Sequence, residues 1–165
     1  MKISHLIDGI RNQSLVLPEF QREHRWVRDQ AKELMVSLIR SYPVGSLLFW
    51  KTDHPPELKN IDKLPETLGA FQVILDGQQR LSTLYMLITG EIPPFYRDVR
   101  SSRDPRQLCF NLDTGEFQYY RASDMKGNPL WWRVVDCFAK DDINVFRIAR
   151  EVASSEDEAF EQAQR

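Results

Sequence analysis

The sequence contains very little cysteine, and its two cysteines form no disulfide or metal-binding pattern. Cys109 and Cys137 lie far apart, and no C-x-x-C pair occurs. A disulfide scaffold needs several cysteines, and a structural zinc site needs pairs of closely spaced ligands. The sequence therefore argues against both classes of protein, and we expect two small buried thiols and no metal site.

Long apolar runs and secretion signals are also missing. A membrane-spanning helix requires about 20 consecutive apolar residues, and no segment approaches that length. Residues 1–5 lack the apolar stretch of a signal peptide. We therefore expect a cytoplasmic protein with no membrane partner, and the 165 residues are enough for a single domain with its own core.

The chain also lacks a large charge of one sign. Its formal net charge of −2 gives no overall attraction for nucleic acid, so DNA contact would need a local patch or another domain. Residues 97–106 contain four arginines and follow the aromatic pair Phe95-Tyr96, whereas the chain becomes acidic from Glu151 onward. We interpret both runs as solvated, although aromatic rings beside guanidinium groups also suit a single nucleic-acid strand.

Several common catalytic signatures are absent. The sequence has no G-x-x-x-x-G-K-[ST] P-loop, no G-x-S-x-G turn and no H-E-x-x-H helix. His5, His24 and His54 are too scattered for a metal site. Only His24, which lies between Arg22 and Arg25, is placed to serve a polar site.

The most informative stretch is a predicted strand, turn and helix at residues 71–88. The apolar run 71–75 predicts a buried strand, and apolar residues then recur at helical spacing from Leu81. Between them, Gly77 allows a tight turn that leads into two amides and a guanidinium, Arg80. The positive end of a helix, unpaired N–H groups and an arginine favour an anion, so we interpret this turn as a nucleotide-phosphate site.

A purely structural interpretation of the same turn stays open. Asp76 and Gln79 have the D-x-x-Q spacing of a capping box, in which the two side chains satisfy N–H groups at a helix start. That motif gives no reason for Gln78 and Arg80 to stand in the same first turn, which favours the functional interpretation.

A second polar stretch lies at residues 19–26. It follows a short predicted strand at 15–17 that Pro18 ends, and it is too polar to be buried without partners. Gln21, Arg22 and Arg25 are donors that suit phosphate, and Trp26 offers a flat face for a base, although a tryptophan more often fills a core. We predict that the two polar stretches face one shared site.

The remaining pattern predicts an α+β fold. Helices are expected at residues 4–12 and 31–42, a central strand at 46–50, and a surface excursion at 52–70.

Asp113-Thr114-Gly115 predicts a hairpin between strands at 108–112 and 116–120. The pair Trp131-Trp132 can belong to a core or to a partner surface, and a helix is expected from Asp141 or Asp142 onward. Because the chain ends while still helical in character, we expect the natural protein to continue past residue 165.

Three motifs, taken together, resemble a known bacterial family. They are L-P-E-F-Q-R through to Trp26, Y-P-V-G leading into Phe49-Trp50, and L-D-G-Q-Q-R-L-S-T-L at residues 75–84. In this order they resemble the N-terminal domain of GmrSD-type modification-dependent restriction endonucleases. The resemblance implies a fold similar to that of ParB and sulfiredoxin, with a mixed sheet, flanking helices and a β-hairpin.

The resemblance also implies which residues form a nucleotide site. The expected catalytic residues are Asp76, Gln79 and Arg80. The expected nucleotide- and phosphate-binding residues are Gln21, Arg22, Trp26, Gly77 and Gln78. Some family members hydrolyse nucleoside triphosphates and thereby control a DNA nuclease in a C-terminal HNH-type domain, and no HNH-like region occurs here. We therefore expect DNA cleavage to need another domain or a partner subunit.

The leading hypothesis is a nucleotide-binding regulatory domain, and a candidate nucleoside triphosphatase, in a phage-defence system against modified DNA. Its ligand would be a nucleoside triphosphate with Mg²⁺, with Asp76 positioning the ion or a water molecule. Two alternatives stay open. One is a non-enzymatic, ParB-like DNA-binding module in which the same arginines contact backbone phosphates. The other is a protein-interaction module with no ligand at the turn.

Overall fold

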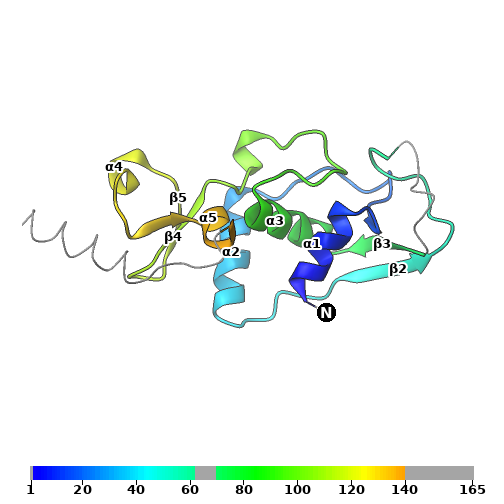
Figure 1. Ribbon diagram of the computed structural model, residues 1–165, viewed down its shortest axis with the longest axis horizontal. Coiled ribbons are helices and arrows are strands. Elements are labelled where there is room, and N and C mark those ends of the chain that lie inside the picture. Colours follow the sequence, from blue (N-terminus) through cyan, green and yellow to red (C-terminus); the bar gives the residue numbers. More distant parts are fainter. Residues whose placement is uncertain (1, 62–69, 140–165) are drawn as a thin grey trace, which may run out of the picture. The chain divides into compact units, whose positions relative to one another are not determined.

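The computed structural model describes residues 2–61 and 70–139, and the chain divides into two compact units (Figure 1). The first unit is Met1–Pro105 and the second is Arg106–Arg165. Each contains a small three-stranded sheet with helices beside it, so the predicted α+β class is confirmed. That the chain forms one ParB- and sulfiredoxin-like domain stays a prediction.

The sheet of the first unit is built around its last strand. It contains β1 (Leu15–Val16), β2 (Leu48–Thr52) and β3 (Phe71–Asp76) in the order β1-β3-β2. The central strand β3 pairs in parallel with β1 and antiparallel with β2. Val73 and Ile74 of β3 are fully buried, one on each face of the sheet, as expected for a strand covered on both sides.

The prediction of a central strand at residues 46–50 is wrong. The strand that forms there, β2, pairs on only one side within the described part of the chain, and Leu48 and Trp50 are 56% and 45% exposed. An apolar run does not reveal how many neighbours a strand has, and here β3 takes the central place because β1 and β2 both pair with it.

Two helices cover one face of this sheet (Figure 1). Side chains of α1 (Ile3–Arg11) and α3 (Gln78–Thr89) share a core with Leu15, Leu17 and Ile74. The opposite face packs Val16, Phe71 and Val73 against Leu58. Side chains of the strands therefore alternate between two apolar layers, which fixes the pairing register of the sheet. Gly77 alone separates the end of β3 from the start of α3.

The helix predicted at residues 4–12 is confirmed as α1, and the one predicted at 31–42 is displaced. The corresponding helix α2 (Arg28–Ile39) begins three residues earlier and ends before Tyr42, which is 56% exposed. A 3-10 turn η1 (Ser101–Arg103) lies in the arginine-rich stretch.

The second unit confirms the predicted hairpin. Strands β4 (Leu108–Asn111) and β5 (Phe117–Tyr119) pair antiparallel, and Gly115 adopts φ +70° in the turn between them. The short helix α4 (Ala122–Met125) is followed by β6 (Trp131–Arg133), which pairs with β4 and includes the half-buried Trp131 and Trp132.

Helix α5 (Val134–Ala139) begins directly after β6 and was not predicted. The helix expected from Asp141 onward and the acidic run lie outside the described residues. Cys109 is buried as expected, whereas Cys137 is half-buried. None of the helices in the described part of the chain has both the length and the apolar character needed to cross a membrane.

Candidate functional site

The two polar stretches meet at one cavity in the first unit, as the sequence predicted. The cavity has a volume of about 350 Å³. Its lining contains all eight predicted site residues and Leu75, namely Gln21, Arg22, Trp26, Leu75, Asp76, Gly77, Gln78, Gln79 and Arg80. Residues about 55 positions apart therefore face the same space, as the hydrogen bond from Gln21 Nε2 to the Leu75 carbonyl (3.1 Å) illustrates.

Helix α3 begins in a way that excludes the capping-box alternative. Its N-cap is Gly77, in the left-handed region at φ +89°, and no side chain caps the helix. A Cβ at this position would overlap Leu47, so only glycine fits without a shift. The first backbone N–H groups of α3 have no partner within the helix, and they lie at the cavity.

Arg80 is held in a fixed orientation by its surroundings. Its Nη1 donates to the Val44 carbonyl at 2.6 Å, and its Nη2 donates to Asp76 Oδ2 at 3.2 Å. Gly45 has φ +81°, and a Cβ there would overlap the guanidinium. The Y-P-V-G motif therefore serves the site by making room for Arg80, a role that its sequence alone does not reveal.

Gln78 and Gln79 are buried and bind the polypeptide. Gln78 Nε2 donates to the Arg22 carbonyl and, at 2.6 Å, to the Tyr96 hydroxyl. Gln79 Oε1 accepts the N–H groups of Arg25 (2.7 Å) and Trp26 (3.1 Å).

Gln79 Nε2 also donates to the Glu23 carbonyl at 3.2 Å. The two amides thus tie residues 22–26 to the start of α3. They line the cavity but act mainly as positioning groups.

Arg22 and Trp26 differ from these amides. The Arg22 side chain is exposed and forms no ion pair among residues 2–61 and 70–139, and Trp26 is half-buried at the cavity wall. Their backbone groups are held by Gln78 and Gln79, so the segment is fixed while the Arg22 guanidinium is available to a ligand.

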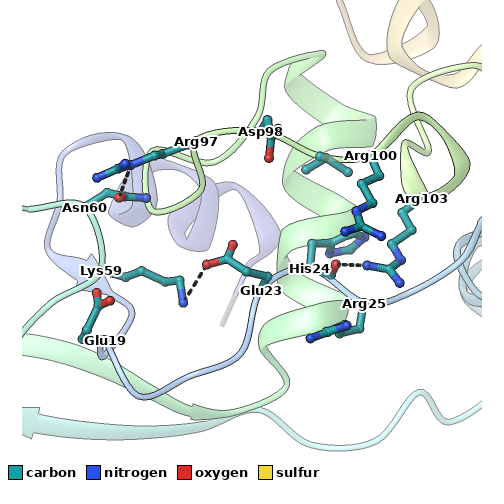
Figure 2. A pocket seen from close by; sticks show the side chains of 11 residues that line it. Glu19, Glu23, His24, Arg25, Lys59, Asn60, Arg97, Asp98, Arg100 and Arg103 are labelled. Carbon is teal, nitrogen blue, oxygen red and sulfur yellow. Dashed lines mark hydrogen bonds and ion pairs between the residues drawn. The ribbon is translucent and has the colours of Figure 1, made fainter.

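A second cavity of about 540 Å³ uses the other residues of the same segment (Figure 2). It is lined by Glu19, Glu23, His24, Arg25, Lys59, Asn60, Arg97, Asp98, Val99, Arg100 and Arg103. Three arginines of the run at residues 97–106, which we expected to be solvated, therefore line a cavity. Their charge alone could not indicate that a cavity lies beside them. Phe95 and Tyr96 are 2% and 4% exposed core residues, so their rings are not open for stacking.

His24 is the buried histidine of this second cavity. It is 5% exposed, the centroids of its ring and the Tyr96 ring lie 6.1 Å apart in an edge-on arrangement, and neither ring nitrogen has a partner in hydrogen-bond geometry among residues 2–61 and 70–139. Burial, and then the nearby Arg103 guanidinium, lowers the pKa of His24 from 6.5 to about 4. The imidazole is therefore neutral near pH 7. No group of three or more His, Cys, Asp or Glu suited to a metal occurs within the described ranges.

Comparisons with known proteins relate the chain to restriction enzymes. Residues 3–162 match the family described as GmrSD restriction endonuclease, N-terminal domain. An uncharacterised protein of Methanocaldococcus jannaschii is 29% identical over 104 residues, which cover 53% of this chain and 18% of that relative. The chain thus spans less than a fifth of the length of this relative.

We predict that Gln79→Ala lowers the free energy of unfolding by about 2 to 4 kcal/mol, because it leaves the N–H groups of Arg25 and Trp26 without an acceptor. The matched control is Gln30→Ala, which removes one exposed bond to the Val27 N–H and should cost about 0.5 to 1 kcal/mol. Denaturant unfolding measures both losses, and equal losses would contradict the positioning role of Gln79.

We predict that His24 makes the protein less stable in acid. The unfolded imidazole binds a proton below its ordinary pKa of 6.5, whereas the folded one resists protonation until about 4, so stability is lost as the pH falls between these values. The loss from this group is about 3 kcal/mol. Denaturant unfolding at several pH values should show the stability difference between wild type and His24→Leu changing by that amount. A difference that is constant with pH would refute the assignment.

Proposed function

We propose that this chain, which belongs to the family of GmrSD restriction endonuclease N-terminal domains, is a nucleotide-binding regulatory domain of a DNA restriction system. The observation that carries the proposal is the convergence of Arg22, Arg80 and the N-terminus of α3 on one cavity. Its volume of about 350 Å³ lies within the range of small-molecule sites.

The phosphate groups would bind at the start of α3. This helix has 12 residues, and its unpaired N–H groups and positive dipole end favour an anion. Gly77 keeps the backbone accessible because it carries no side chain. Arg80 uses two of its five N–H groups for Val44 and Asp76, so further donors remain for phosphate oxygens.

Trp26 and Arg22 would hold the rest of the nucleotide. The half-buried Trp26 ring lies at the wall of the same cavity and suits stacking on a base. Arg22, which is exposed, can reach phosphate oxygens with a bidentate fork.

Asp76 links the site to Mg²⁺. The Asp76 side chain is 72% exposed, and its Oδ2 lies 3.2 Å from Nη2 of Arg80. A carboxylate beside a triphosphate repels it unless a cation lies between them, and Mg²⁺ typically binds one or two carboxylates together with substrate phosphates. The donor set therefore fits a nucleotide with Mg²⁺, which would neutralise phosphate charge.

Hydrolysis of the nucleotide is the finer part of the proposal. Asp76 would be the exposed base that orients a water molecule, and Arg80 would be the cation beside the phosphates. Gln79 would position the segment of Arg25 and Trp26, which forms the other side of the cavity. DNA cleavage itself we assign to another domain or a partner subunit.

The proposal predicts that nucleoside triphosphate with Mg²⁺ raises the melting temperature of the protein. A ligand at a hundredfold excess over its dissociation constant stabilises by about 2.7 kcal/mol. Arg22→Gln should weaken binding about tenfold or more, because it removes charge-assisted hydrogen bonds. The matched control Arg40→Gln removes an exposed arginine that does not line the cavity and should behave as wild type. Absence of a shift with any nucleotide, or equal shifts in both variants, would reject the proposed site.

The position of Asp76 predicts a reversed metal dependence in Asp76→Asn. Without Mg²⁺ this variant should bind the nucleotide more tightly than wild type, because the repulsion between carboxylate and phosphate is gone. With Mg²⁺ it should bind more weakly, because one ligand for the ion is lost. Calorimetric titration with and without Mg²⁺ measures both affinities. If the substitution changes them in the same direction, Asp76 does not lie between the ion and the phosphates.

A further inference from the structure

The second cavity is lined by more cationic than anionic side chains. It has five cationic side chains, four arginines and Lys59, against the three carboxylates of Glu19, Glu23 and Asp98. His24 adds none because burial lowers its pKa to about 4. The lining therefore has two more positive than negative side chains, whereas the formal net charge of the whole chain is −2.

The arginines of this cavity keep their charge unpaired. Lys59 is neutralised by Glu23 at 2.9 Å. By contrast, Arg25, Arg97, Arg100 and Arg103 form no ion pair within the described part of the chain. Arg97 donates to Asn60 Oδ1 at 3.1 Å and Arg103 to the His24 carbonyl at 3.4 Å. These neutral acceptors orient the two guanidiniums without cancelling their charge.

The arginines are spread along the cavity. Figure 2 shows Arg97 beside Asn60 at one end and Arg100 with Arg103 near His24 at the other. Like charges held in one cavity repel, and an anion that spans both ends relieves the repulsion. An extended polyanion therefore suits the lining better than one small phosphate.

The lining also indicates which polyanion fits. Binding of single strands relies on exposed aromatic faces, and the neighbouring Phe95 and Tyr96 are buried in the core. Guanidinium groups without a stacking surface are typical of contacts to backbone phosphates, which position a duplex without reading its sequence.

We propose that this cavity binds the backbone phosphates of duplex DNA through Arg25, Arg97, Arg100 and Arg103. The site goes beyond the proposed function, because it uses other residues and another ligand than the nucleotide cavity. It would also give this chain a DNA contact of its own through a local patch, one of the two routes that the net charge of the sequence left open.

The test is the affinity of the full chain for a fluorescently labelled short DNA duplex, measured by anisotropy at several NaCl concentrations. Arg97→Gln/Arg100→Gln removes two exposed cavity arginines. We expect about tenfold weaker binding or more at low salt, and a salt slope of log K reduced by about 2, since each backbone contact contributes about 0.9. Arg25→Gln is a separate variant that should also weaken binding, with a slope reduced by about 1.

The matched control is Arg40→Gln/Lys51→Gln, which removes two exposed charges of the same unit outside the cavity and should leave affinity and slope nearly unchanged. The proposal is overturned if wild type does not bind the duplex at low salt, if cavity and control variants behave alike, or if only a labelled single strand responds. It is also overturned if the cavity variant keeps its DNA affinity and instead loses the melting shift given by nucleotide. The nucleotide proposal fails separately, when that shift is absent in wild type.

Discussion

Both cavities depend on the hydrogen bonds between the side-chain amides of Gln78 and Gln79 and the backbone of residues 22–26. This segment has no regular secondary structure, so its N–H and carbonyl groups have no ladder partners of their own. The first turn of α3 supplies donors and acceptors that match them. Without these bonds, buried polar groups would lose their partners, and residues 22–26 would not be held in this conformation.

This one segment contributes to both cavities in the first unit. Arg22 and Trp26 line the cavity at the start of α3, whereas His24 and Arg25 line the second cavity. Lys59 reinforces the arrangement by donating to the Gln21 carbonyl at 2.6 Å. A displacement of this segment at one cavity would therefore also change the lining of the other.

Local features of the fold and site could be predicted from the sequence. The change from strand to helix period at Asp76-Gly77 marks the turn, and Asp113-Thr114-Gly115 marks the hairpin. Both signals lie within a few residues of the structure they describe. The common location of the two polar stretches could also be predicted, because residues 19–26 are too polar to be buried without partners and both stretches contain donors that suit phosphate.

Features that depend on distant partners could not be predicted. Gly45 is required because the Arg80 guanidinium lies beside it, and no residue near Gly45 in the sequence indicates that contact. The same holds for Gln79, whose residue type shows a donor and an acceptor but not the N–H groups it meets 54 positions away. The positive charge of the arginines in the second cavity could likewise be read from the sequence, but the cavity that they line could not.

Two arginines line the cavity at the start of α3, and they differ in how firmly the protein holds them. Arg80 is 18% exposed and already oriented by Val44 and Asp76, so it can meet an anion with little loss of side-chain entropy. Arg22 is exposed, and its side chain must be ordered when it binds, which costs about 0.5 to 1.5 kcal/mol. For an anionic ligand of this cavity, the fixed Arg80 would therefore determine the selectivity for ligand geometry. The exposed Arg22 would add affinity only for a ligand large enough to reach it.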